Sequence, residues 1–458
     1  MTRIKSKLKS TYTCQSCGAS FPRWLGRCSS CGEWSSLVEE RAEPGRASPA
    51  KLEVRAPRLA DVTAEDARRF PTGISELDRA LGGGPVAGGV ILLGGDPGIG
   101  KSTLLMQALG ALCHAGHRAL YVTGEESAAQ VALRAKRIGG PAVDEVRILA
   151  TNSLEEAEAA LETLGATIAV IDSIQTLRAA ELASPMGSVG QLREATSRLI
   201  EIAKRRHIAL FLIGHVTKEG AIAGPKVLEH LVDTVLAFEG DRAHAFRMVR
   251  ATKNRFGPAQ EVGVFEMIEE GLREVPDPSA LFLAERPSHA SGSLVSPTAE
   301  GTRPLLVEVQ ALVSPAAFGS ARRVASGLDA NRLAILLAVL ERKAGLHVAD
   351  HDVFASIAGG VRVEERSLDL ALSIAIASSF RNHPAPPELA IFGEVGLAGE
   401  VRAVPRPGPR VVEAKKLGFK RVVLPLISAD QLSAEERRGV DLIPVRSIVE
   451  AIDASLGV

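Results

Sequence analysis

The sequence predicts an α/β protein in three parts: a small cysteine-rich module, a parallel-sheet core and a second α+β domain. Short apolar blocks alternate with helical patterns from about residue 70 to residue 272, which is typical of parallel strands joined by helices. Four cysteines precede this region, and a proline-rich stretch separates it from further strand and helix patterns. The expected divisions are residues 1–40, a linker over 41–69, the core over 70–272, a linker over 273–289, and the last domain over 290–458.

Length and composition limit the functions open to the chain. A chain of 458 residues with 46% hydrophobic residues can form two or three domains with full cores. Lys plus Arg and Asp plus Glu number 54 each, so any binding to nucleic acid must come from local patches. The sequence has neither the apolar centre of a signal peptide nor a run of about 20 apolar residues. We therefore expect a cytoplasmic protein without a membrane segment.

The N-terminal module is expected to bind a metal ion. Cys14 and Cys17 are separated by two residues, as are Cys28 and Cys31, and ten residues lie between the pairs. Four thiolates at this spacing can surround Zn²⁺ as a tetrahedron. The module is too short to bury a core, so the metal would supply its folding energy. Two disulfides are the alternative, which the lack of secretion signals disfavours.

Residues 90–105, VILLGGDPGIGKSTLL, form the strongest chemical motif of the chain. An apolar strand pattern leads into a glycine-rich loop that lets the backbone wrap around a polyphosphate, with N–H groups facing the anion. Lys101 would reach the β- and γ-phosphates of ATP or GTP, and Ser102 would ligate Mg²⁺. The alternative is a glycine-rich turn that happens to carry a lysine. The expected nucleotide-binding residues are Gly95, Asp96, Pro97, Gly98, Ile99, Gly100, Lys101, Ser102 and Thr103.

Three further strands are expected to end at the same edge of the sheet. Apolar blocks at 118–123, 167–171 and 208–213 lie between helical patterns and have the character of strands buried on both faces. Ligands of open α/β sheets bind outside the carboxyl ends of the strands. Residues that follow these blocks are therefore candidates for the nucleotide site.

Two acidic residues stand at these strand ends. Asp172 suits the Mg²⁺ side of the site, and Glu125 could polarise the attacking water. Capping of a helix is the alternative role for Asp172 and for Glu126. His215 also follows a strand, where a histidine is often only structural.

Further motifs resemble a known family. The segment PTGISELD at 71–78 resembles the RecA-type ATPases, and KNRFG at 253–257 together with the cysteine module closely resembles the bacterial RadA/Sms DNA repair proteins over essentially the whole chain. The resemblance implies a RecA-like core behind a zinc ribbon-like module. It also implies an ATP-dependent motor that forms hexameric rings, binds single-stranded and branched DNA, and promotes branch migration of recombination intermediates alongside the RecA recombinase.

Lys253 and Arg255 follow the expected strand at 244–252 and, being two residues apart, should face the same side. In RecA-like assemblies the nucleotide lies between subunits, and a basic residue of the neighbour reaches the γ-phosphate. We expect Lys253 and Arg255 to act in this way on a neighbour's ATP. An exposed strand end with ordinary surface charges is the alternative.

Contacts to DNA are expected from loops at the same sheet edge. The loop after Asp172 contains Arg178, and the loop after His215 contains Lys218 and Lys226. Aromatic residues make up only 4% of the chain, so neutralisation of phosphates should outweigh base stacking. Solvated charges without a partner are the alternative.

The last domain resembles the peptidase domain of Lon proteases, which cleave peptides with a serine activated by a lysine. Ser367 falls at the position of the nucleophile, and Gly408 stands at the position of the lysine. Lys415 and Lys416 come later, on the expected next helix. Because Ser367 would lack its base, we expect a domain without peptidase activity that forms the ring or supports DNA.

Three classes of function thus stay open from the sequence. A DNA-stimulated motor is favoured, and an ATP-dependent protease and a nucleotide-switched signalling ATPase are the alternatives. Stimulation of hydrolysis by DNA would distinguish the motor from both.

Overall fold

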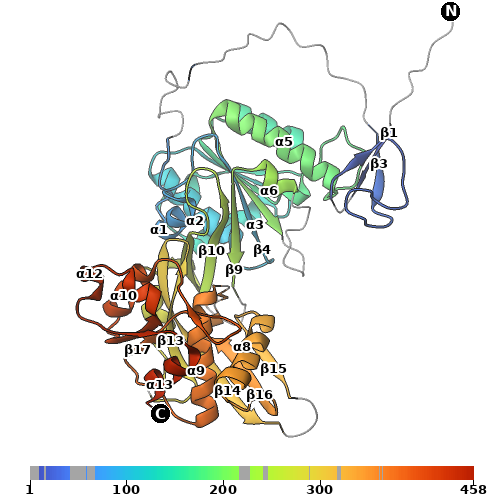
Figure 1. The fold of residues 1–458 in the computed structure, drawn as a ribbon. Helices are drawn as coiled ribbons and strands as arrows, with labels where there is room; N and C mark the ends of the chain where they lie inside the picture. The colour runs from blue at the N-terminus through green and yellow to red at the C-terminus, as the bar shows by residue number, and fades with distance from the viewer. Residues whose placement is uncertain are drawn as a thin grey trace, which may run out of the picture. The chain divides into compact units, whose positions relative to one another are not determined.

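A computed structural model describes residues 10–14, 17–41, 58, 68–215, 227–240, 246–287, 289–316, 321–360, 362–363 and 365–457. The chain forms two compact units, residues 1–274 and residues 275–458 (Figure 1).

The cysteine module is a small antiparallel sheet. Its strands are β1 (Ser10–Cys14), β2 (Ser20–Phe21) and β3 (Leu37–Arg41), in the order β2-β1-β3. The apolar residues packed together here are few, namely Leu37 with Tyr12, Ala19, Phe21 and Leu25 around the cysteines. A core of this size is too small to hold the module by hydrophobic burial alone.

Nine strands form the central sheet of the first unit in the order β12-β11-β10-β9-β4-β8-β7-β5-β6. The strands from β9 to β6 are parallel, and β10, β11 and β12 continue the sheet in antiparallel pairing. The predicted α/β class is therefore confirmed. The strands are β4 (Val90–Gly95), β5 (Ala119–Thr123), β6 (Arg147–Ala150), β7 (Ile168–Asp172), β8 (Ala209–His215), β9 (Thr234–Glu239), β10 (Phe246–Asn254), β11 (Val262–Ile268) and β12 (Gly271–Glu274).

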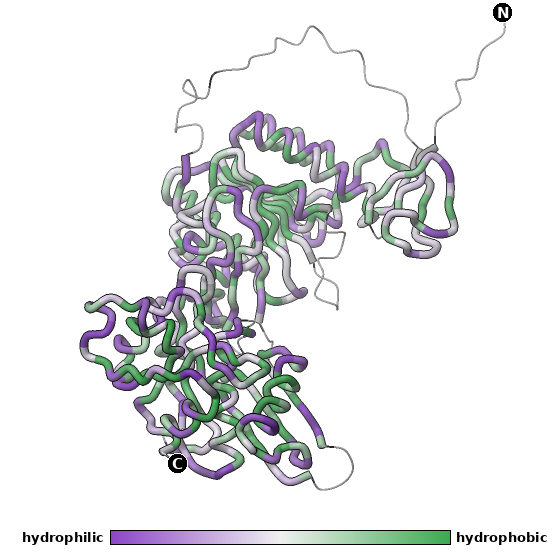
Figure 2. The backbone as a smooth tube through the Cα atoms, in the orientation of Figure 1, coloured by the Kyte–Doolittle hydropathy of each residue, from purple (hydrophilic) through white to green (hydrophobic). Residues whose placement is uncertain are grey.

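Helices cover both faces of this sheet, and successive residues of one strand point to opposite layers. Leu93 of β4 packs with α1, α2 and α3, whereas Leu92 packs with α4, α5 and α6. Burial on both faces explains why the parallel strands are continuous apolar runs, and the hydrophobic residues concentrate along them (Figure 2). The helices are α1 (Ser75–Leu81), α2 (Lys101–His114), α3 (Ala128–Ile138), α4 (Leu154–Thr163), α5 (Val189–Arg206) and α6 (Val227–Leu231).

The second unit is an α+β fold around a mixed sheet of order β15-β16-β14-β13-β17-β20-β21. Helix α9 (Asp369–Arg381) is buried from Asp369 to Ser378 and packs on β13 and β14. The strands are β13 (Ser293–Glu300), β14 (Arg303–Pro315), β15 (Arg323–Ser326), β16 (His351–Ile357), β17 (Leu389–Ile391), β20 (Arg421–Pro425) and β21 (Asp441–Val445), with a separate pair β18 (Glu394–Val395) and β19 (Val401–Arg402). The other helices are α7 (Pro278–Phe282), α8 (Ala330–Lys343), α10 (Pro407–Lys416), α11 (Leu426–Asp430), α12 (Ala434–Arg437) and α13 (Ile448–Leu456).

Among the helices of the described residues, none combines the length and the apolar character needed to cross a membrane.

Candidate active site

The loop between β4 and α2 is built as an anion-binding turn. β4 ends at Gly95 and α2 begins at Lys101, so the loop joins the carboxyl end of a central strand to a helix N-terminus. Gly100, the residue before α2, has a φ of 116° and no side chain with which to cap the helix. The N–H groups at a helix N-terminus of this kind favour the binding of a phosphate.

Gly95 is needed at the strand end because β9 approaches closely. A Cβ atom here would lie 2.6 Å from the carbonyl oxygen of Phe238 and 3.0 Å from the Phe238 Cβ. No side chain fits without a shift of the neighbouring strand, so the loop presents its backbone to a ligand. This cradle fits a nucleotide polyphosphate.

Lys101 lies buried over this loop. Its Nζ donates hydrogen bonds to the carbonyl oxygens of Gly95, at 2.6 Å, and Asp96, at 2.9 Å. Burial lowers the pKa of the ammonium group, and the carboxylates of Asp172, Glu125 and Asp96 oppose that shift. The structure thus brings the expected lysine into the electrostatic field of both strand-end acidic residues.

Asp172 and Glu125 come together because β7 and β5 pair in parallel. Thr123 lies opposite Asp172 in the register, so the residues after β5 face the end of β7. The Asp172 carboxylate is buried, and the Ser173 hydroxyl donates a hydrogen bond to Glu125. Hydroxyl and carboxylate oxygens, such as those of Ser102 and Asp172, are the ligand types that Mg²⁺ prefers.

Sequence reasoning missed Tyr121 and Arg134. The Tyr121 hydroxyl donates a hydrogen bond to Asp172, and Arg134 of α3 donates to the same hydroxyl at 2.9 Å. Arg134 is also paired with Glu126. In the sequence, Tyr121 is one residue of an apolar strand block. Its hydroxyl is a polar group within a strand that is buried on both faces, and this is the signal that could have marked it as functional.

The KNRFG segment lies at the opposite end of the strands from the phosphate loop. Gly95 at the end of β4 pairs with Phe238, whereas Ile91 near its start pairs with Thr234, which in turn pairs with Asn254 of β10. Four residues of extended strand separate these two levels, roughly 13 Å. The segment therefore does not reach the loop of its own subunit.

Lys253 and Arg255 both contact residues around the start of β9. The Lys253 Nζ donates to the carbonyl oxygens of Glu229, at 2.6 Å, and Val232, at 2.7 Å. Arg255 forms an ion pair with Asp233 at 3.2 Å, and half of its side chain is exposed. Burial and the nearby Arg255 charge lower the pKa of Lys253. The strand extends to Asn254, two residues beyond the expected end, so Lys253 lies within the strand and Arg255 just after it.

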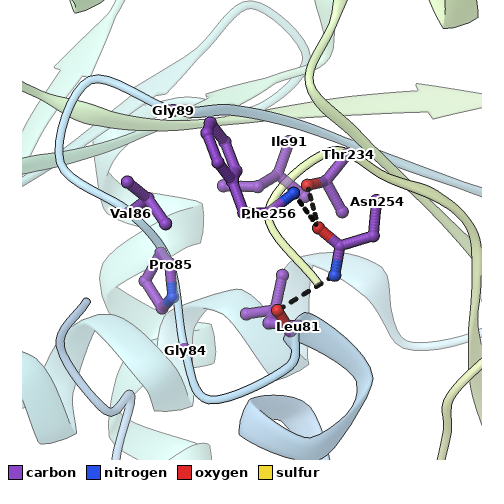
Figure 3. Close-up of a pocket in the computed structure, with 9 residues that line it drawn as sticks. All are labelled: Leu81, Gly84, Pro85, Val86, Gly89, Ile91, Thr234, Asn254 and Phe256. Atoms are coloured by element: carbon purple, nitrogen blue, oxygen red, sulfur yellow. Dashed lines mark hydrogen bonds between the residues drawn. The ribbon is translucent and has the colours of Figure 1, made fainter. Parts of the chain in front are cut away.

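Asn254 shapes the turn after β10. Its Oδ1 accepts a hydrogen bond from the Phe256 N–H at 3.0 Å, and its Nδ2 donates to the Leu81 carbonyl at 3.1 Å (Figure 3). The Phe256 ring remains partly exposed. It lines a small pocket with Leu81, Gly84, Pro85, Val86, Gly89, Ile91, Thr234 and Asn254.

The expected DNA-contacting residues are only partly described. Arg178 is exposed. Its backbone N–H donates a hydrogen bond to the Asn152 carbonyl, in the segment before α4, at 2.8 Å. Lys218 and Lys226 lie outside the described residues. His215 ends β8 next to Gly95 in the sheet.

The four cysteine sulfur atoms form one compact cluster. All lie within 4.8 Å of one another, with Cys14 and Cys31 at 3.7 Å and Cys17 and Cys28 at 3.6 Å. A tetrahedral ion with Zn–S bonds of about 2.3 Å requires S–S separations of about 3.8 Å. The residues therefore fit a tetrahedral metal ion.

Two equivalent turns present these sulfur atoms. The Gly18 N–H donates to the Cys14 carbonyl and the Gly32 N–H donates to the Cys28 carbonyl, both at 2.9 Å. Both glycines have a positive φ, at 73° and 80° respectively, which explains the glycine after each cysteine pair. Trp24 and Trp34 are exposed on the same module, and Arg27 stacks over the Trp34 ring.

Ser367 is fully buried in the second unit. Its hydroxyl donates to Glu365 at 2.8 Å and accepts from Arg410 at 3.2 Å. Arg410 is itself buried and forms an ion pair with Glu365. Gly408 is the second residue of α10 and lies beside Glu436. Lys415 donates to the Glu436 carbonyl, and Lys416 forms an ion pair with Asp277. A guanidinium stays protonated, so Arg410 cannot serve as the base that a serine nucleophile needs.

This fold and its glycine-rich loop define a P-loop nucleotide-binding protein with a metal-binding module. Family models agree along the chain. A model described as an AAA domain matches residues 55–221, a rubredoxin metal binding domain matches residues 12–39, and subunit ChlI of Mg-chelatase matches residues 320–427.

Relatives resemble the chain over almost its full length. It is 46% identical to the DNA repair protein RadA of Bacillus subtilis over 99% of this chain and 100% of that protein. It is 50% identical to RadA of Pseudomonas aeruginosa, over 98% and 99% of the two chains, and 47% identical to RadA of Haemophilus influenzae, over 97% and 98%. The chain belongs to the RadA family of DNA repair proteins, which confirms the resemblance of its motifs.

Replacement of Cys28 by Ser tests the metal centre. Loss of one of four thiolates should release the metal and unfold the module, because its apolar core is too small to hold it. Metal analysis would measure the loss of metal, and limited proteolysis within the module would measure its unfolding, whereas the thermal unfolding of the ATPase domain should not change. Cys113→Ser, outside the module, is the matched control for the metal content. Wild-type protein that contains no zinc would contradict this prediction.

Replacement of Arg410 by Ala tests the buried ion pair. It leaves Glu365 without its cation, so we expect a loss of about 3–5 kcal/mol in the unfolding free energy of the second unit. Lys416→Ala, which removes an exposed pair with Asp277, should cost less than about 1 kcal/mol. Denaturant unfolding measures both, and equal effects would contradict the prediction.

The same pair gives a pH dependence. Burial alone would raise the pKa of Glu365, but the hydrogen bond and charge of Arg410 lower it overall from 4.5. The stabilisation is therefore complete above that value and is lost as the pH falls through the lowered pKa. Arg410→Ala should remove this acid-dependent component.

Proposed function

We propose that this chain is a DNA-dependent ATPase and DNA motor in recombinational repair, which promotes branch migration or the processing of recombination intermediates with RecA. The observation that carries the proposal is the meeting of Lys101, Asp172 and Glu125 at the phosphate-loop edge of the sheet. Membership in a family of DNA repair proteins supports DNA as the partner. The protein would act in the cytoplasm.

In this proposal each residue of the loop edge has one role. The loop residues from Gly95 to Thr103 bind the phosphates through backbone N–H groups, and Lys101 exchanges its carbonyl contacts for the β- and γ-phosphates. Ser102 and Asp172 hold Mg²⁺, which supplies charge neutralisation at the phosphates. Glu125 orients and polarises the attacking water. Zn²⁺ at the four cysteines has a structural role.

Lys253 and Arg255 would complete the site of a neighbouring subunit. Their position at the amino end of β4 and β9 supports action in trans, because their own loop lies at the other end of these strands. A composite site requires an oligomer, and we propose a hexameric ring. The domain over 70–272 hydrolyses ATP, and the domain over 290–458 forms part of the ring or supports DNA.

DNA binding is proposed for the loops that contain Arg178, Lys218 and Lys226. They follow β7, which ends at Asp172, and β8, which lies between β7 and the phosphate-loop strand β4. Single-stranded and branched DNA are the proposed ligands. Contacts to phosphates would make the binding depend steeply on salt.

ATP turnover with and without single-stranded DNA tests the proposal. We expect DNA to stimulate hydrolysis by the wild-type protein. Lys101→Ala should abolish turnover in both conditions, because this residue supplies charge to the transition state. Lys204→Ala, on the surface of α5, is a control that should keep the wild-type rates. ATP hydrolysis at the same rate with and without DNA would favour the signalling ATPase. Normal turnover by Lys101→Ala would refute the assignment of the phosphate loop.

Mixing of subunits tests action in trans. Lys253→Ala should bind ATP but hydrolyse it about 10³-fold more slowly or worse, because the transition state loses a cation. A mixture with Lys101→Ala subunits should regain activity. At some subunit interfaces the Lys101→Ala subunit would supply an intact Lys253 to the intact phosphate loop of a Lys253→Ala subunit. Each variant mixed with itself is the control. Continued inactivity after verified subunit exchange would argue against action in trans.

A further inference from the structure

Two connections tie the end of β5 to the end of β7. The Tyr121 hydroxyl of β5 donates to the Asp172 carboxylate of β7, and the Ser173 hydroxyl after β7 donates to Glu125 after β5. The acidic residues proposed for Mg²⁺ and for water are therefore each held by a hydroxyl from the other strand. A carboxylate restrained in this way keeps its oxygen atoms in a fixed direction.

Arg134 fixes Tyr121 in turn. Its guanidinium donates to the Tyr121 hydroxyl at 2.9 Å, lies 5.7 Å from the centre of the Tyr121 ring, and is anchored by Glu126. Because an arginine can only donate, the tyrosine oxygen must accept this bond and use its proton toward Asp172. The direction of both hydrogen bonds is thereby determined.

Tyr121 is fully buried. Its hydroxyl is therefore shielded from water, and its hydrogen bonds to Asp172 and Arg134 do not compete with bonds to solvent.

We propose that Tyr121, oriented by Arg134, is a positioning residue that holds Asp172 in the geometry needed for a magnesium–nucleotide complex. This inference rests on the proposed ATPase function. It predicts a specific defect: nucleotide binding without magnesium should be normal, and the gain in affinity on addition of Mg²⁺ should be reduced. Residues that orient metal ligands in this way typically contribute about 10–100-fold to metal affinity.

Tyr121→Phe removes the hydroxyl and keeps the ring in the core. We expect a Mg²⁺ midpoint about 10-fold higher in equilibrium ADP binding, with unchanged ADP affinity in the presence of a chelator. The Mg²⁺ midpoint of ATP hydrolysis should rise in parallel. Tyr12→Phe is the matched control, because Tyr12 is the other tyrosine of the chain and lies in the cysteine module.

Arg134→Gln provides a second variant. It should raise the Mg²⁺ midpoint in the same direction, and the double variant with Tyr121→Phe should show less than the product of the two effects, because both changes act through one hydroxyl. Thermal unfolding of each variant shows whether the core is intact.

The outcomes separate the inference from the function on which it rests. A folded Tyr121→Phe protein with the wild-type Mg²⁺ midpoint refutes the positioning role and leaves the ATPase proposal standing. Equal loss of ADP affinity with and without Mg²⁺ also refutes it, because that is the effect of a merely structural residue. A wild-type protein without Mg²⁺-dependent ADP binding overturns both.

Discussion

The structure depends on parallel pairing, which makes β4, β5, β7 and β8 end at one edge of the sheet. Parallel neighbours need crossover connections, and the helices that supply them cover both faces and bury the strands completely. The carboxyl edge is therefore the place where backbone groups and polar side chains from distant segments can meet outside the apolar core. Lys101, Asp172 and Glu125 are brought together by this edge, although nothing in their local sequence connects them.

Charge at this edge is balanced among a few groups. The Lys101 ammonium is buried against two carbonyl oxygens, and the surrounding carboxylates counter the effect of burial on its pKa. Bonds from an ammonium to phosphate oxygens are stronger than bonds to neutral carbonyls. Lys101 is thus held in a position from which a polyphosphate can attract it.

In the second unit, Ser367 has the sequence position of a peptidase serine but contacts a glutamate and an arginine. Arg410, Glu365 and Ser367 form a buried network in which the cation cannot give up its proton. A buried pair of this kind holds segments in register, because removal of either charge leaves the other unsolvated. The sequence reasoning considered the later lysines and overlooked the arginine two residues after Gly408.

Motifs whose chemistry is local were predictable from the sequence. The glycine-rich loop, the paired cysteines and the acidic residues after apolar strands need only short spacings, and fold class follows from the alternation of strand and helix patterns. The bond between Tyr121 and Asp172, the distance of Lys253 from its own loop, and the partners of Ser367 were decided by the tertiary structure. They depend on which strands are neighbours and in what register, and packing of the whole sheet sets both.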